Sequence, residues 1–154
     1  MGRMKKSVTI AFAVATLCAG FAVVTALPGS ATPSTGGAST TLLAQGTYTS
    51  DNGSQDFVTV MNTFPVGSSS GWHSHPGQVT GIVQAGAITL YKGNNPCHGK
   101  TYSAGQAFTE NPSNIYEGVN LGSVPAVVFV TFRAVPVGGS PRIDQPAPTT
   151  VCPA

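Results

Sequence analysis

The sequence predicts an all-β fold, arranged as a sandwich or a small barrel. Residues 56–64 (DFVTVMNTF) and 87–92 (AITLYK) alternate apolar and polar side chains, and residues 124–135 (VPAVVFVTFRAV) are rich in β-branched and aromatic residues. Clusters of Gly, Pro, Asn and Ser separate these runs. Downstream of the apolar N-terminal run, no stretch shows helical periodicity with capping residues, so short strands and frequent turns define the class.

The first element, residues 1–31, is predicted to be a secretory signal peptide. Arg3, Lys5 and Lys6 precede an apolar run at residues 8–27, which is followed by small residues. The run is also just long enough to cross a bilayer as a helix, so an uncleaved N-terminal anchor is the alternative. We therefore expect a secreted, extracellular protein with no membrane contact beyond that anchor.

The charge of the remaining chain is small. The sequence has seven Lys and Arg against five Asp and Glu, and three of the basic residues lie in the predicted signal peptide. Four basic and five acidic residues remain, for a net charge of −1. This part of the chain has no basic stripe that would attract a phosphate backbone, so we expect no nucleic acid as a partner.

Three further segments follow in order. Residues 32–41 contain only small, uncharged residues and proline, and predict a flexible linker. Residues 42–137 contain the β-like runs and predict the barrel. Residues 138–154 form a proline-rich tail, expected to lie outside the sheets. Cys97 and Cys152 are the cysteines outside the signal peptide, and an oxidising compartment predicts that they form a disulfide that ties the tail to the barrel.

The strongest candidate for chemistry is the stretch GWHSHPG at residues 71–77. On a strand, residues i and i+2 share one face, so the imidazoles of His73 and His75 would lie side by side. Imidazole suits zinc, copper, iron and nickel. A solvated histidine pair without a metal is the alternative. His98, the third of the three histidines, follows Cys97 in a loop and is expected at the surface.

The spacing around this pair resembles the first motif of the cupin superfamily, G-x5-H-x-H-x3-E-x6-G. The matching positions are Gly67, His73, His75 and Gly86. The glutamate position of the motif falls on Val79, so the usual carboxylate is absent there. Gln78 precedes it by one residue and would donate a carbonyl oxygen only if the Pro-Gly turn before it introduced a bulge.

The stretch from Gly105 to Asn120 resembles the second cupin motif, G-x5-P-x-G-x2-H-x3-N, with these two residues at matching places. The histidine position falls on Tyr116, for which two interpretations stay open. Its phenolate would be an anionic ligand if a metal drove the deprotonation. Alternatively, Tyr116 fills the barrel with its hydroxyl hydrogen-bonded. Glu110 lies close to this motif and is within reach of the barrel mouth.

The resemblance covers about residues 42–137, and GWHSHPG, YSAGQAF and PRIDQPAP are similar to segments of small exported actinobacterial single-domain cupins. It implies a single-domain double-stranded β-helix, or jelly roll, with a divalent metal inside the barrel. The candidate ligands are His73, His75, Tyr116 and Gln78. Zinc, copper, nickel, manganese and iron are all candidate metals, but two imidazoles without a carboxylate would hold iron(II) or manganese weakly.

Three functions remain open at this point. One is a secreted cupin that binds a metal and a small molecule in the barrel, and that as an enzyme would be dioxygenase-like or isomerase-like. Another is a non-catalytic extracellular module that binds a small molecule. A third is an envelope-associated structural domain. The resemblance also implies a homodimer as one oligomeric state open to the chain, and fold alone does not choose among these functions.

Overall fold

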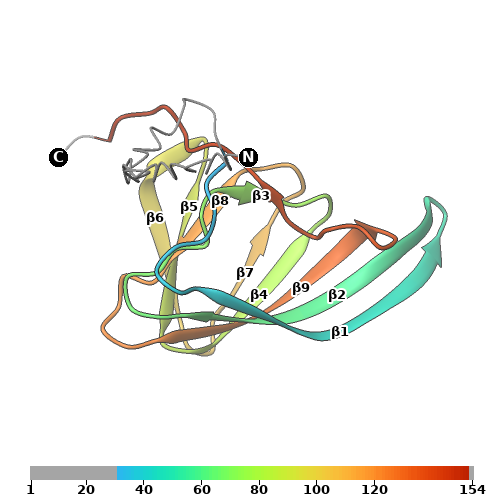
Figure 1. The fold of residues 1–154 in the computed structure, drawn as a ribbon, viewed down its shortest axis with the longest axis horizontal. Coiled ribbons are helices and arrows are strands. Elements are labelled where there is room, and N and C mark those ends of the chain that lie inside the picture. Colours follow the sequence, from blue (N-terminus) through green and yellow to red (C-terminus); the bar gives the residue numbers. More distant parts are fainter. Residues whose placement is uncertain (1–30, 153–154) are drawn as a thin grey trace, which may run out of the picture.

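The computed structural model describes residues 31–152, and every regular element in them is a β-strand (Figure 1). The predicted signal peptide therefore lies outside the described residues, except for Ala31. In the described part, no helix has the length and apolar character needed to span a membrane. The strands are β1 (Ser39–Ser50), β2 (Gly53–Phe64), β3 (His73–Ser74), β4 (Val79–Ala85), β5 (Ala87–Lys92), β6 (Asn95–Ser103), β7 (Ala107–Glu110), β8 (Tyr116–Val119), β9 (Ala126–Pro136) and β10 (Ile143–Asp144).

These strands form two antiparallel five-stranded sheets that enclose one core (Figure 1). The first sheet has the order β1-β2-β9-β4-β7, and the second has the order β10-β3-β8-β5-β6. The predicted all-β class and jelly-roll barrel are thus confirmed. The three runs with strand patterns are found as β2, β5 and β9.

The alternating pattern of each strand decides which side chains enter the core. Along β2, Val58 and Val60 are buried. Phe57, the residue before Val58, points the other way and is exposed. Val128 and Val130 of β9 repeat this spacing beside them. The second sheet contributes Ile88 of β5 to the same apolar cluster. Because one face of each sheet is apolar, the two sheets must close on each other.

The segment before β1 differs from the predicted flexible linker. Thr35 and Ser69 exchange two backbone hydrogen bonds of 2.9 and 3.3 Å, and the Trp72 amide donates to the Thr32 hydroxyl at 2.7 Å. The strand β1 already begins at Ser39. Residues 32–41 have no large apolar side chain to signal burial. Ala38 packs against the core, and these main-chain and hydroxyl hydrogen bonds, rather than a hydrophobic pattern, hold most of the segment on the barrel.

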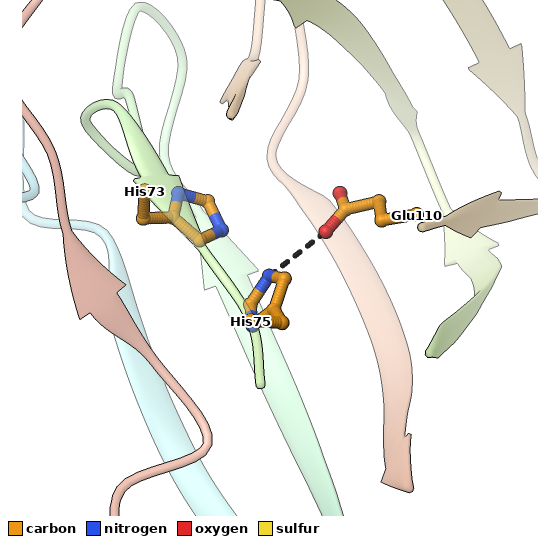
Figure 2. A group of neighbouring side chains, drawn as sticks. All are labelled: His73, His75 and Glu110. Atoms are coloured by element: carbon orange, nitrogen blue, oxygen red, sulfur yellow. Dashed lines mark ion pairs between the residues drawn. The ribbon is translucent and has the colours of Figure 1, made fainter. Parts of the chain in front are cut away.

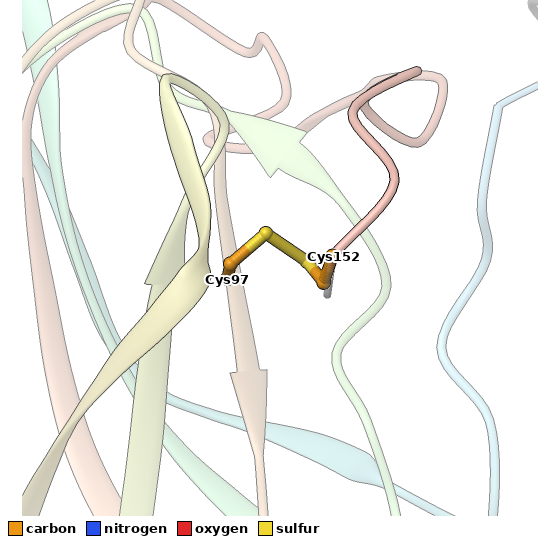
Figure 3. Close-up of a disulfide and its surroundings, with 2 residues drawn as sticks. All are labelled: Cys97 and Cys152. Atoms are coloured by element: carbon orange, nitrogen blue, oxygen red, sulfur yellow. A yellow bond between two sulfur atoms is a disulfide. The ribbon is translucent and has the colours of Figure 1, made fainter. Parts of the chain in front are cut away.

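The C-terminal tail also joins the barrel, contrary to the expectation that it lies outside the sheets. Its strand β10 pairs with β3, and Ile143 lies opposite Ser74 while Asp144 lies opposite His73. Further along, a disulfide joins Cys97 of β6 to Cys152 (Figure 3), as predicted. Because 55 residues separate the two cysteines, the cross-link contributes about 4 kcal/mol on the chain-entropy account.

Candidate metal centre

The two histidines of the predicted pair lie inside the barrel on and next to β3. His73 is 8% exposed and His75 3% exposed. Their ring centroids are 4.8 Å apart, with the ring planes nearly perpendicular. The short strand β3 lies between β8 and β10 in its sheet, and both histidines line a cavity inside the barrel rather than the solvent-exposed surface. The solvated-pair alternative does not fit this burial.

Two backbone carbonyls orient these rings. The Nδ1 atom of His73 lies 2.8 Å from the carbonyl oxygen of Gly71, and Nδ1 of His75 lies 2.7 Å from that of Pro141. A carbonyl oxygen accepts hydrogen bonds but cannot donate them, so each imidazole donates its Nδ1–H. In the neutral ring Nε2 then has a free lone pair. This arrangement is typical of histidines that bind metals through Nε2.

Glu110 supplies the carboxylate that the sequence motif lacks. It ends β7, and its Oε2 atom lies 2.9 Å from Nε2 of His75 (Figure 2). In the pairing of β4 with β7, Glu110 lies directly opposite Val79, the residue at the motif's glutamate position. Facing residues of adjacent strands point to the same side of a sheet. The carboxylate therefore comes from the neighbouring strand, and the expectation of a site without a carboxylate is wrong.

Although this contact is short, it is not a hydrogen bond. Nε2 of His75 is buried and has no hydrogen-bond partner in the described structure. With Nδ1–H donated to Pro141, a neutral imidazole would present its Nε2 lone pair to a carboxylate oxygen at 2.9 Å. Two acceptors at this distance repel each other unless a cation, or a second proton on His75, lies between them. A buried polar atom without a partner is costly and calls for such an explanation.

Burial keeps His73 in its neutral form. The pKa of its imidazole is lowered from 6.5 to about 4, chiefly by burial; the nearby carboxylate of Glu110 raises it, and Arg142 and His75 lower it. The hydrogen bond to the Gly71 carbonyl raises it slightly. At neutral pH the imidazole is therefore unprotonated. Only a neutral imidazole binds a metal ion.

Together these three side chains form a buried group with suitable metal-binding atoms. One ligand atom from each of His73, His75 and Glu110 lies within 4.8 Å of the others (Figure 2). We refer to them as the triad. Two imidazole nitrogens and one carboxylate oxygen are a ligand set found in zinc sites that keep a coordination position open for water or substrate. Iron(II) also accepts two histidines and one carboxylate. The donors therefore fit a divalent transition metal.

Neither of the other two predicted ligands lines the cavity that the triad lines. Tyr116 lies opposite His73 in the pairing of β3 with β8 and is buried. Its hydroxyl accepts a hydrogen bond of 2.9 Å from the amide of Asn111, which agrees with the interpretation as a hydrogen-bonded filler of the barrel. The Gln78 side chain is exposed. Metal ligation by Tyr116 or Gln78 stays a prediction. His98 is exposed, as expected.

A cavity of about 150 Å³ opens beside the triad within the barrel. Its apolar walls come from both sheets and include Val60, Phe64, Ile88, Leu90, Phe108, Val128, Val130 and Phe132. The triad and Arg142 are its ionisable lining residues, and a few uncharged polar residues also line it: Ser34, Ser39, Thr40, Asn62 and Ser70. A cavity of roughly this volume is known to hold benzene. The site is therefore suited to a small ligand with an apolar body and one polar group.

Comparisons with known proteins agree with this architecture. Residues 60–132 match the cupin domain family. No curated protein sequence matches the chain.

Among solved structures, the chain is similar to a conserved protein with a double-stranded β-helix domain from Klebsiella pneumoniae subsp. pneumoniae MGH 78578, at 22% identity over 58% of this chain and 74% of that chain, with a TM-score of 0.50. A cupin domain from Bordetella pertussis Tohama I matches at 16% identity over 63% of this chain and 93% of that chain, also with a TM-score of 0.50.

A recombinant oxalate oxidase in complex with glycolate matches at 20% identity over 64% of this chain, with a TM-score of 0.51. This chain spans 51% of that enzyme. At such identities the similarity concerns the fold alone. The match of residues 60–132, the structural neighbours and the two enclosed sheets agree on a cupin-type double-stranded β-helix as the fold of the barrel.

Proposed function

We propose that this protein binds one divalent metal ion through His73, His75 and Glu110 and holds a small molecule beside the ion in the barrel cavity. The observation that carries the proposal is the Nε2 atom of His75, which is buried without a hydrogen-bond partner in the described structure and lies 2.9 Å from a carboxylate oxygen. A cation between these atoms replaces the repulsion by two favourable contacts. The same cation would take the lone pair of His73, which burial keeps neutral.

In this proposal each residue of the triad supplies one ligand atom to the metal. His73 and His75 supply neutral nitrogen ligands, and the carbonyls of Gly71 and Pro141 fix their orientation. Glu110 supplies a negative charge, which removes the reason to favour zinc and copper over iron and manganese. Bound metal would polarise an oxygen of a ligand as a Lewis acid. The apolar walls of the cavity exclude water from the ligand's body.

A non-catalytic binding module is the second candidate. It is favoured by Tyr116, which occupies the histidine position of the second cupin motif and has its hydroxyl engaged with the Asn111 amide. A site with three protein ligands then holds a metal and a small molecule without a further acid or base in contact with them. Detection of turnover for any bound compound would exclude this candidate.

Export is part of the same proposal. The disulfide between Cys97 and Cys152 supports it, because such cross-links persist in oxidising compartments. We infer that the protein acts outside the cytoplasm after its N-terminal segment has directed export. Fractionation of cells that express the full chain, with the disulfide detected by a mass shift upon reduction and alkylation, tests this inference. Protein found only in the cytoplasm with free thiols would refute it.

The metal site is tested by elemental mass spectrometry. The protein is purified without chelator and without a histidine tag, beside a His73→Ala/His75→Ala double variant and a Glu110→Gln variant. We expect about one metal ion per chain in the wild type, none in the double variant and a reduced content in Glu110→Gln. Metal content in the wild type equal to that of the double variant would refute the proposal.

A further inference from the structure

The tail brings a guanidinium group into the cavity of the proposed metal centre. Arg142 directly follows Pro141, whose carbonyl orients His75, and directly precedes β10, which pairs with β3. Arg142 lines the same cavity as all three residues of the triad. The cavity thus contains both a candidate metal site and a fixed cation.

Two hydrogen bonds hold the guanidinium in place and leave it with free donors. Nε donates to Oδ1 of Asp144 at 2.6 Å, and Nη2 donates to the carbonyl oxygen of Ser70 at 2.8 Å. A guanidinium group has five N–H donors, so its remaining donors are available to a ligand. The side chain is 29% exposed, which places it at the boundary between cavity and solvent. It is therefore preoriented but not saturated.

The charge at this end of the cavity depends on the metal. Glu110 and Asp144 contribute two negative charges, and Arg142 contributes one positive charge. Without a metal the group is net negative and should repel an anion. With a divalent ion it becomes net positive, in a cavity whose other walls are mostly apolar. Desolvation by these walls strengthens the attraction for a ligand of opposite charge.

We propose that the ligand of this site is a small monocarboxylate with an apolar body, whose carboxylate lies between the metal and Arg142. This inference rests on the proposed metal site and adds the chemical class of its ligand. The planar guanidinium matches a carboxylate better than an ammonium group does, because it offers parallel N–H donors. The cavity volume and its aliphatic and aromatic lining suit a branched or aromatic body rather than a sugar or a dicarboxylate.

Isothermal titration calorimetry on the full, metal-loaded protein tests the proposal. The probes are 3-methylbutanoate and benzoate, each beside its neutral amide of the same shape. We expect the carboxylates to bind and the amides to bind at least roughly 10-fold more weakly, in line with the strength of charge-assisted hydrogen bonds. Removal of the metal with a chelator should abolish carboxylate binding, because the cavity end then becomes net negative.

Two variants separate the charge of Arg142 from its structural contacts. Arg142→Gln should weaken carboxylate binding roughly 10- to 100-fold and leave amide binding unchanged. Arg142→Lys should be intermediate, because it keeps the charge but loses the fork of donors. The control is Asp144→Asn, which removes the partner of Arg142 in the tail but not the guanidinium. It should bind carboxylates at least as tightly as the wild type does.

Metal content, measured on each sample, keeps the two proposals distinct. Wild-type protein that holds no metal after loading refutes the proposed function, and the carboxylate site with it. Wild-type protein with a full complement of metal but equal affinity for carboxylate and amide refutes the carboxylate site alone. Carboxylate affinity that is unchanged in Arg142→Gln, or reduced to the same extent in Asp144→Asn, refutes the role of the guanidinium.

Discussion

The buried, neutral state of His73 predicts that the metal-free protein loses stability in mild acid. The pKa of His73 is about 4 in the folded protein against 6.5 for a free imidazole. Between these two pH values the unfolded chain binds a proton at His73 and the folded chain does not. Protonation therefore favours the unfolded state as the pH falls.

The magnitude follows from the size of the pKa shift. One pKa unit corresponds to about 1.4 kcal/mol, so a decrease from 6.5 to about 4 costs about 3 kcal/mol in the free energy of unfolding. The loss begins as the pH falls below about 6.5, is nearly complete at about pH 4, and is absent above pH 7. Domains are typically stable by roughly 5–15 kcal/mol, so the effect is large enough to measure.

The assay is urea denaturation of the chelator-treated protein at a series of pH values, followed by tryptophan fluorescence, since the chain has one tryptophan. The comparison is with His73→Asn, whose amide can still donate to the Gly71 carbonyl but does not titrate. The wild type should lose about 3 kcal/mol more than the variant between pH 7 and pH 4. Parallel pH profiles of the two proteins would falsify the assignment of the loss to His73.

Three further predictions concern the same site. Replacement of Glu110 by Gln should lower zinc affinity, measured by competition with a chromophoric chelator, by more than the roughly 10- to 100-fold typical of residues that only orient ligands; unchanged affinity would remove Glu110 from the site. Cys152→Ser should lower the free energy of unfolding by up to about 4 kcal/mol and also weaken metal binding, because the tail supplies the Pro141 carbonyl; a variant with wild-type metal affinity would show that the tail stays docked without the disulfide. Val79→Glu should destabilise the metal-free protein, since it places a second carboxylate opposite Glu110, and added metal should restore its melting temperature, whereas Val79→Gln, which buries an uncharged polar group at the same core position, should be destabilised less and should not be restored by metal.

Much of the fold was predictable because its signals are local. The alternation in residues 56–64 and 87–92 marks β2 and β5, and these patterns depend only on neighbouring side chains. The pairing of Cys97 with Cys152 was predictable because these two cysteines are the ones outside the predicted signal peptide. The docking of residues 32–41 was not predictable, because a hydrophobicity pattern does not reveal which segments form main-chain hydrogen bonds with the barrel.

The candidate site divides in the same way. His73 and His75 are two residues apart, so the sequence by itself determined that they share one face of an extended segment. The carboxylate of Glu110 reaches them through the register of β7 on β4, which sets it opposite Val79. Motif spacing along the chain indicates which positions within a segment share a face, but not which residue of another strand lies beside them.

The sequence therefore determined the all-β class, the histidine pair and the disulfide, while the tertiary structure decided what surrounds the pair. Glu110 lies on β7, in the other sheet from His73, and Pro141 and Arg142 lie in the tail that pairs with β3. The physical reason is that side-chain direction is a local property of the backbone, whereas cross-strand register and the docking of a tail depend on long-range hydrogen bonds and packing throughout the barrel.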